Sequence, residues 1–300
     1  MAEAPTGAGV LLTEVVGAAT TQARPVPRGV VALLLHDRSA RAGLLLGAAI
    51  LVGAFLGPLV LRGNPNRLDP SAVLAPPSRA HLLGTDEYGR DELLRLVDGG
   101  RRSLLAATTV LGLGAAIGTV AGVGIAMSGG VADVLAMRLV DVVLALPDLV
   151  VVLAVLGALG PGFGNLVVAL TIPTAAFVAR LARSSVRGAR GSPVVAAASA
   201  AGVARTRIVA GHVLPDVVAQ VLVIMTMNIG MVLVGIAGLS FLGLGIQQPT
   251  ADWGAMLADA RLYMGNAPWL VLAPAGAIML TLVAANLVAD ALVRVGATGA

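Results

Sequence analysis

Six long, unbroken apolar runs leave this chain few ways to fold. Charged and turn-forming residues bound the runs, which cover approximately 43–61, 103–127, 132–159, 164–182, 216–240 and 269–293. A helix needs about 20 apolar residues to cross the hydrocarbon core of a bilayer, and runs of this length suffice. The runs are continuous and lack the period-two alternation of a membrane β-barrel. The sequence therefore predicts an all-α polytopic membrane protein with six transmembrane helices.

The polar residues exclude several classes of protein. Only 12% of the residues are charged, and all 20 basic residues are arginine. A chain without lysine has no P-loop lysine, so it is not a Walker-type ATPase on its own. There is no cysteine, and the three histidines, His36, His81 and His212, are dispersed, so we expect no metal site. We also expect no cofactor in this chain and no nucleic-acid partner.

An even number of spans places both ends of the chain on one side of the membrane. The stretch from Arg180 to Arg207 contains six arginines and no acidic residue. Since loops rich in arginine stay in the cytoplasm, this stretch and both termini are expected there. The predicted parts are a disordered cytoplasmic tail (1–40), a first transmembrane helix (41–62), an extracytoplasmic loop with an interfacial elbow helix (63–102), a transmembrane core (103–294) with a cytoplasmic loop (184–215), and a short cytoplasmic tail (295–300).

The second apolar run carries glycines at every fourth position, Gly114, Gly118 and Gly122. Small residues at this spacing form a stripe that lets two membrane helices approach closely. With Gly112 they also imitate a dinucleotide-binding motif, but the spacing is wrong and no strand precedes it. We therefore expect the stripe to pack against another helix.

A polar, turn-rich stretch, "GTDEYGRDE", precedes the second run. Its glycines suit turns, and its short acidic side chains suit bonds to nearby backbone N–H groups. The leucines that follow predict an apolar helix face, from which Arg95, Arg101 and Arg102 reach the lipid headgroups. A plain solvated loop is the alternative, and catalysis by the acids is disfavoured because no nucleophile or metal-ligand spacing accompanies them. The residues of this elbow motif are Gly84, Thr85, Asp86, Gly89, Arg90 and Asp91.

The third run contains charged residues within the expected membrane span. Arg138 and Asp141 lie three positions apart, so they are expected to pair on one helix face. Pro147 should kink the helix, and Asp148 follows it directly. A carboxylate at that depth faces a cavity or a partner, so Asp148 either lines or gates the substrate path or makes a structural hydrogen bond to a neighbouring helix.

The connection between the fourth and fifth runs is expected to fold into a short helix, a sharp turn at Gly202, and a second helix that ends near His212 and Pro215. On spacing alone it is either an ordinary amphipathic connector or a docking element. It resembles the loop of ATP-binding-cassette importer permeases that docks into the ATPase. The positions in register are Ala197, Ala198, Gly202, His212, Leu214 and Pro215, while Ala196 stands where the family has glutamate.

Two further segments are similar to the C-type permeases of dipeptide, oligopeptide and nickel importers. These are "HLLGTDEYGRDELLRLVDGGRRSL" (81–104) and "LSFLGLGIQQPTADWGAML" (239–257). The resemblance implies the fold of a type I importer permease that forms half of a pathway for short peptides across the cytoplasmic membrane. It implies no covalent chemistry in this chain.

The same resemblance implies the partners. They are a second homologous permease in a heterodimer, two ATPase subunits that bind ATP and Mg²⁺, and an extracytoplasmic substrate-binding lipoprotein. The alternatives are a nickel or opine-type cargo for the same machine, or an ion-coupled secondary transporter whose midplane aspartate relays protons. An intramembrane enzyme is the least favoured alternative, because no serine and histidine lie at matching depth.

Overall fold

The computed structural model describes residues 37–189 and 191–298, and the polypeptide there is helical, with one isolated β-bridge between Thr85 and Asp91. Within these described ranges, five helices are long and apolar enough to cross a membrane, or six if α5 and α6 together form one bent span. The main helices are α3 (Arg38–Val60), α4 (Glu92–Ser128), α5 (Gly130–Ala145), α6 (Asp148–Leu159), α7 (Phe163–Ala189), α8 (Pro193–Ala200), α9 (Arg205–Ile208), α10 (Leu214–Phe241), α11 (Trp253–Ala260) and α12 (Trp269–Thr298).

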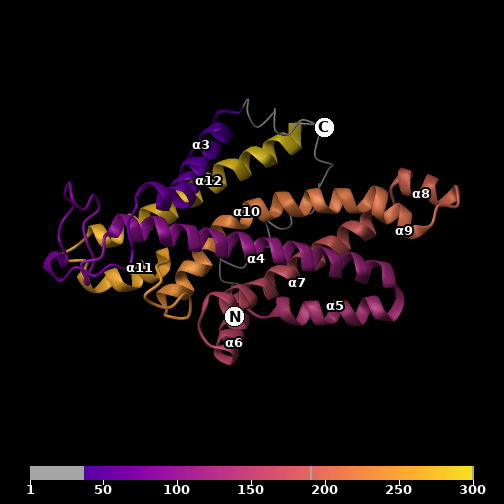
Figure 1. Cartoon of the computed structure of the whole chain (residues 1–300). Coiled ribbons are helices and arrows are strands. Elements are labelled where there is room, and N and C mark those ends of the chain that lie inside the picture. The colour runs from indigo at the N-terminus through magenta and orange to yellow at the C-terminus, as the bar shows by residue number, and fades with distance from the viewer. Residues whose placement is uncertain (1–36, 190, 299–300) are drawn as a thin grey trace, which may run out of the picture.

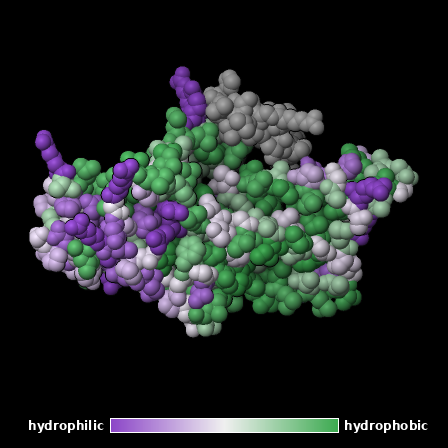
Figure 2. Space-filling view, in the orientation of Figure 1, coloured by the Kyte–Doolittle hydropathy of each residue, from purple (hydrophilic) through white to green (hydrophobic). Residues whose placement is uncertain are grey.

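The long helices define two ends of the molecule (Figure 1). Residues 61–91, which we call the arm, lie with α11 at one end, the arm end. Helices α8 and α9 lie at the other, the loop end. Because α3 runs toward the arm and α12 runs away from α11, the described ends of the chain lie away from the arm, where Arg294 pairs with Asp37 at 3.1 Å. Figure 2 shows hydrophilic surface at both ends and a mostly apolar surface between them.

The predicted glycine stripe packs α4 against α7. A Cβ added at Gly118 would stand 2.5 Å from the carbonyl oxygen of Ala175, and one at Gly122 would stand 2.3 Å from that of Ala179. A Cβ at Gly114 would overlap Thr174 in the same way. Any larger residue at these positions would push the two helices apart. The expected packing role is confirmed.

The elbow helix is not a separate element. The helix that begins after Asp91 continues without interruption through the second apolar run, so α4 has 37 residues. At 1.5 Å per residue it is about 55 Å long, which exceeds the roughly 30 Å of a bilayer core. Gly99 and Gly100 do not interrupt it, because α11 packs directly on them. The first turns of α4 therefore belong to the arm end.

The third apolar run is broken instead of gently kinked. Helices α5 and α6 meet at an angle of 93° around Leu146 and Pro147. Proline disfavours the helical conformation in the preceding residue, and Leu146 has an extended backbone (ψ 144°). The amides of Val150 and Val151 then bond to the carbonyl of Pro147, which begins a new helix. The proline effect was predicted, and its size is larger than a kink.

The predicted helix–turn–helix of the loop end exists, but its second helix does not end at Pro215. After α9, the chain forms a π-helical segment (Val209–Val213) that leads directly into α10. The amide of Leu214 donates to the carbonyl of Val209, five residues back. Pro215 then falls in the first turn of α10, where its missing N–H group is tolerated. A π-segment inside a helix is rare and is often found at functional sites.

Candidate functional site

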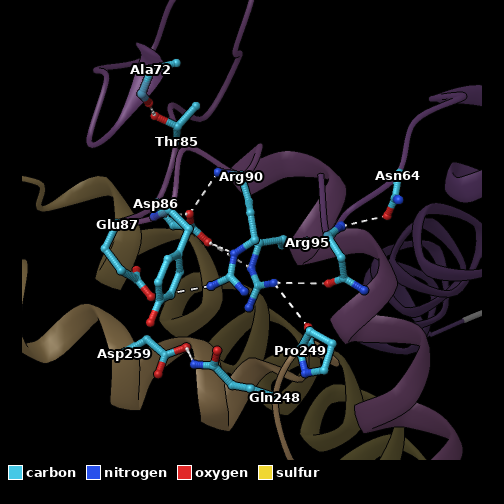
Figure 3. A network of polar contacts seen from close by, with 12 residues as sticks. Asn64, Ala72, Thr85, Asp86, Glu87, Arg90, Arg95, Gln248, Pro249 and Asp259 are labelled. Atoms are coloured by element: carbon cyan, nitrogen blue, oxygen red, sulfur yellow. Dashed lines mark hydrogen bonds and ion pairs between the residues drawn. The ribbon is translucent and has the colours of Figure 1, made fainter. Parts of the chain in front are cut away.

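Asp86 is the centre of a buried polar network at the arm end (Figure 3). Its carboxylate accepts hydrogen bonds from the backbone amides of Tyr88 and Arg90, both at 2.9 Å. It also accepts from Arg90 Nε at 2.5 Å and lies 3.3 Å from Arg95 Nε. Both side chains of the Asp86–Arg90 pair are about 95% buried or more. The expected bonds from a short acidic side chain to nearby backbone N–H groups are present at Asp86.

Arg95 does not reach the headgroups as predicted. It is 2% exposed and lies between the arm and the chain that follows α10. One guanidinium nitrogen, Nη1, donates to Asn66 Oδ1 and to the carbonyl of Pro249, both at 3.5 Å. Arg95 therefore ties together three segments that are distant in sequence. Of the other two arginines, Arg101 is exposed, and Arg102 is partly exposed and pairs with Asp98 at 3.0 Å.

The remaining residues of the elbow motif shape the arm. A Cβ at Gly89, whose φ is +73°, would stand 1.8 Å from the carbonyl oxygen of Asp69. Gly84 has φ +78° and leaves room for Trp269 in the same way. Thr85 Oγ1 donates to the carbonyl of Ala72 and accepts from the amide of Ala75. Only glycine fits both turns without strain.

Asp91 joins the arm to the start of α4. Its Oδ1 accepts a hydrogen bond from the amide of Leu94 at 3.0 Å, which caps the helix. Its Oδ2 lies 2.9 Å from His81 Nδ1. The capping bond satisfies an amide that the helix itself leaves unpaired. Within the motif, these roles are structural.

Acidic side chains outnumber arginines around the network. Glu87, Glu92 and Asp259 line, with Asp86 and Arg95, a cavity of about 10 Å³, which has room for roughly one water molecule. Burial, and then repulsion by neighbouring carboxylates, raises the pKa of Glu87, and burial raises the pKa of Asp259. Among the described residues, no three acidic or histidine side chains are arranged to hold a metal ion. The cluster joins the arm, the first turns of α4, α11 and the chain that follows α10, and we call it the lock.

Helix α11 completes this lock through two residues that the sequence did not single out. Asp252 caps α11 by accepting from the amides of Gly254 and Ala255. The indole of Trp253 donates to the carbonyl of Leu96 at 2.9 Å, which fastens α11 to the first turns of α4. An Asp–Trp pair ahead of a short apolar helix was the available signal, since aspartate is a favoured helix cap.

At the loop end, the predicted docking residues lie at the surface. Helix α8 ends in a Schellman motif, in which the amide of Val203 donates to the carbonyl of Ala198 and that of Gly202 to the carbonyl of Ser199. Gly202 has φ +77°, and nothing lies within 4 Å of a Cβ placed there. The exposed members of the predicted set are Ala196, Ala197, Gly202, His212 and Pro215, while Ala198 and Leu214 are partly buried.

A hollow of about 270 Å³ separates α8 from the rest of the loop end. Its lining is mainly apolar and comes from α7, α8, α9 and the π-segment. Val186 lies on the α7 side and Val195 on the α8 side, with Arg205 and Ser199 as the polar members. The short helix therefore contacts the bundle through Val195, while most of its other residues are exposed.

The candidate pathway residues lie on α5 and at the start of α6. Asp141 pairs with Arg180 of α7 at 2.6 Å, and not with Arg138 as predicted. Both members of this pair are about half exposed. Asp148 is exposed at the first turn of α6, directly after Pro147. Across the described part of the chain no hydrogen bond or ion pair holds the Asp148 carboxylate, so it has no structural partner there.

The sequence also left Asp133 unremarked. This aspartate of α5 is almost fully buried and pairs with two arginines of α7, Arg183 at 2.6 Å and Arg187. An acid next to an apolar run requires a partner, and the arginine-rich end of the fourth run was the signal that could have supplied it. Residues 50 and 54 positions apart meet here because α5 lies alongside α7.

The family described as "Binding-protein-dependent transport system inner membrane component" matches residues 114–295 of this chain. The match begins at the glycine stripe and extends through α5 to α12. It includes the loop end, α11 and Asp148, but it leaves out the arm and the first turns of α4.

Individual relatives extend the similarity into those parts. The probable D,D-dipeptide transport system permease protein DdpC of Escherichia coli is 37% identical over 241 residues, which are 80% of this chain and 81% of that protein. The dipeptide transport system permease protein DppC of Alkalihalophilus pseudofirmus is 35% identical over 86% of this chain and 85% of its own length. The nickel transport system permease protein NikC of Escherichia coli is 34% identical over 85% of this chain and 92% of that protein.

Proposed function

This chain belongs to the family of binding-protein-dependent transport system inner membrane components, and we propose that it is the permease subunit of an ATP-driven importer of short peptides. Two relatives that cover most of the chain are named for dipeptide transport, which supports peptides as the cargo. A third is named for nickel transport, which is the alternative cargo for the same machine. The chain itself carries out no covalent chemistry in this proposal.

The observation that carries the proposal is the projecting loop end. Helix α8 and the turn at Gly202 expose small side chains, and a hollow separates them from the bundle. The surrounding stretch 180–207 has six arginines and no acidic residue. A short apolar helix that projects from the surface, with basic residues around it, is suited to docking in a groove of another protein. We assign that partner to the ATPase subunits, which would bind ATP and Mg²⁺, and we call residues 184–215 the coupling loop.

A second permease subunit would complete the pathway. Asp148 is exposed on a helix of the apolar zone, and the half-exposed Asp141–Arg180 pair lies on the neighbouring helices. Charged groups at membrane depth face protein or water and avoid lipid. This polar face therefore favours a heterodimer in which α5 and α6 face the pathway. Each permease would then form half of it.

The orientation in the membrane follows from the arginines of stretch 180–207. Positively charged loops stay in the cytoplasm, so the loop end is cytoplasmic, together with both termini. The arm end then faces outward, where the substrate-binding lipoprotein would dock. The predicted tail at 1–40 lies almost entirely outside the described residues. The protein would be a multi-pass component of the cytoplasmic membrane.

Affinity purification of this chain from native membranes in mild detergent tests the proposal. We expect a second permease and ATPase subunits with P-loops to accompany it, identified by mass spectrometry. Reconstitution of that complex with its binding protein should give peptide uptake that requires ATP. Uptake of nickel and not of peptides would transfer the function to the alternative cargo. A chain that purifies alone and transports in response to an ion gradient would support a secondary transporter and refute the importer.

Gly202→Trp tests the docking assignment. A tryptophan there meets open space within this chain, and the strain of its positive φ (+77°) is shared by the control below, so any effect beyond that of the control comes from a partner. We expect at least a tenfold loss of peptide-stimulated ATP hydrolysis. Gly160→Trp is the matched control, because Gly160 also has a positive φ (+81°) and open space, but lies at the other end of α7. Normal peptide-stimulated hydrolysis in Gly202→Trp would refute the docking role.

A further inference from the structure

The turn between α4 and α5 is held by both sides of the coupling loop. This turn begins at the end of α4, passes through Gly129 and Gly130, and leads into α5. One contact comes from α7, which enters the coupling loop. The other comes from α9, which leaves it. The turn therefore lies between the two segments that any movement of the loop would displace.

The first contact is the buried ion pair of Asp133. Arg183 Nε donates to Asp133 Oδ1 at 2.6 Å, and Arg187 donates to Oδ2. Asp133 is 1% exposed, whereas Arg183 and Arg187 are increasingly open to solvent toward the end of α7. Two guanidinium groups on a single carboxylate fix both its position and its orientation.

The second contact satisfies the end of α4. Arg205, which follows the turn at Gly202, donates from Nη2 to the carbonyl of Ala126 at 3.0 Å. The last four carbonyls of a helix have no partner within the helix, and an arginine is a favoured partner for them. The start of the outgoing segment is thus joined to the end of α4, 79 residues earlier.

Helix α5 is otherwise weakly held. Of its 16 residues, only Asp133 and Met137 are buried. Gly129 and Gly130 both have positive φ, +65° and +55°, and neither has a neighbour within 4 Å of an added Cβ. A glycine pair in open space gives little resistance to rotation, so α5 is not rigidly attached to α4. At this end, α5 is positioned chiefly by the Asp133 ion pairs to α7.

A displacement of α7 at the loop end is therefore transmitted along α5. This helix is about 24 Å long and ends at the break around Pro147, where Asp148 is exposed. A packed helix moves as a unit, so a shift at Asp133 reaches the break. Through this connection the coupling loop would act on the residues that face the pathway.

We propose that Asp133 is a positioning residue for coupled transport, and that the α4–α5 turn is the element through which the coupling loop moves α5 and α6. The inference rests on the proposed function, since it assumes that the loop docks on an ATPase. It adds which contact inside this chain conveys the movement. Arg183 and Arg187 provide one side of that contact, and Arg205 provides the other.

The test uses the whole complex in proteoliposomes and measures peptide uptake per ATP hydrolysed. For Asp133→Asn we expect the assembled complex to hydrolyse ATP within about twofold of the unaltered complex, while uptake per ATP falls at least tenfold. Asp133→Glu keeps the charge and should restore most of the uptake. A purely structural role would lower both rates together. Uptake per ATP within twofold of the unaltered complex in Asp133→Asn would overturn the inference.

A second variant decides the matter if Asp133→Asn fails to assemble. The double substitution Arg187→Gln with Arg205→Gln weakens both contacts at exposed side chains and leaves Asp133 with Arg183. It should lower uptake per ATP, whereas Arg102→Gln, which breaks a surface pair at the arm end, should not. Unchanged coupling in the double variant would overturn the inference. An unaltered complex without ATP-dependent uptake would refute the proposed function itself, and the inference with it.

Discussion

At the scale of single residues, the ion pairs of this protein differ in how deeply they are buried. At the arm end, Asp86 and Arg90 are buried together, and Arg95 extends their network to the chain after α10. Breaking such a pair by removing one partner leaves an uncompensated buried charge. Between the two ends, the Asp141–Arg180 pair is about half exposed, so water screens it and it contributes little to stability.

Arg95→Ala is therefore expected to destabilise the protein strongly. The substitution leaves Asp86 with one guanidinium fewer and frees Asn66 and the carbonyl of Pro249. Removing one member of a buried ionic group costs roughly 3–5 kcal/mol. Thermal unfolding of the purified complex would detect this as a large fall in the midpoint. Arg102→Ala is the control, since an exposed pair is worth about 0–1 kcal/mol, and equal midpoints for the two variants would contradict the assigned burial.

Glu87 gives the arm end a pH dependence of defined sign. Its raised pKa means that the folded protein holds a proton at pH values where an unfolded chain, with a carboxyl near 4.5, has released it. The stability from this group is fully present below pH 4.5 and is lost as pH rises through the folded-state pKa. Glu87→Gln should therefore flatten the fall in melting temperature above pH 4.5 and raise its value at pH 7.

Asp69→Asn is the matched control for this measurement. Asp69 belongs to the same arm, but hydrogen bonds from Ser71 lower its pKa below 3.8. Its stability contribution is present above pH 3.8 and is lost as pH falls, which is the opposite sign. The variant should thus leave the slope above pH 4.5 unchanged. A slope that responds to Asp69→Asn and not to Glu87→Gln would contradict the assignment.

At the scale of helices, the sequence predicted what depends on local pattern. Apolar runs gave the spans, and the stripe at Gly114, Gly118 and Gly122 gave a packing face, because both rest on fixed spacing along one helix. Pro147 gave a distortion for the same reason. The 93° size of the break was not predictable, since it depends on what α5 and α6 contact after the break.

Contacts between distant segments could not be predicted from the sequence. Arg95 is a basic residue beside an apolar helix face, which is typical of a headgroup-binding residue. Only the fold brings Pro249 to it across 154 positions. The same holds for Asp133 and its arginines 50 and 54 residues away. For Asp141 the sequence predicted a local partner, Arg138, three positions earlier. In the structure its partner is Arg180 of α7. For Arg95, Asp133 and Asp141, the sequence did not predict the partner that the fold supplies.

Helices α3 and α12 form a pair whose contact can be fixed covalently. A Cβ at Gly47 would stand 3.9 Å from the Cβ of Ala284, which is close to the mean of about 3.8 Å in disulfides. The chain has no cysteine, so Gly47→Cys with Ala284→Cys introduces the only pair. We expect complete oxidation, seen by mass spectrometry, with uptake retained because the helices proposed to face the pathway are α5 and α6. Gly53→Cys with Ala284→Cys should remain reduced, since Gly53 has no neighbour within 4 Å.

Retained uptake in the protein with the oxidised α3–α12 disulfide would show whether the two helices move relative to each other. Both helices would then move as one body during transport. A locked protein that no longer transports would show instead that α3 slides along α12, and would place α3 among the moving parts.

At the scale of the whole molecule, long helices join the arm end, with its buried polar network, to the loop end, where α8 is largely exposed beside a hollow. Asp148 lies between them, exposed and without a partner among the described residues. Asp148→Asn should therefore leave expression and assembly intact, because no contact within the described chain is lost. If the carboxylate faces the cargo, uptake should fall by about tenfold, or ~1.4 kcal/mol in the barrier. Uptake equal to that of Asp98→Asn, a control at the arm end that loses the pair with Arg102, would remove Asp148 from the pathway.

The lock at the arm end also sets an order for biogenesis. Arg95 emerges from the ribosome 154 residues before Pro249, its partner in the lock. At about 5–20 residues per second, roughly 8–30 s pass during synthesis before the two can meet. Through that interval Arg95 lacks the carbonyl of Pro249 as a partner. The nascent chain is thus most open to membrane proteases before α11 is made, and a truncation upstream of residue 249 should be degraded even though most of its spans are complete.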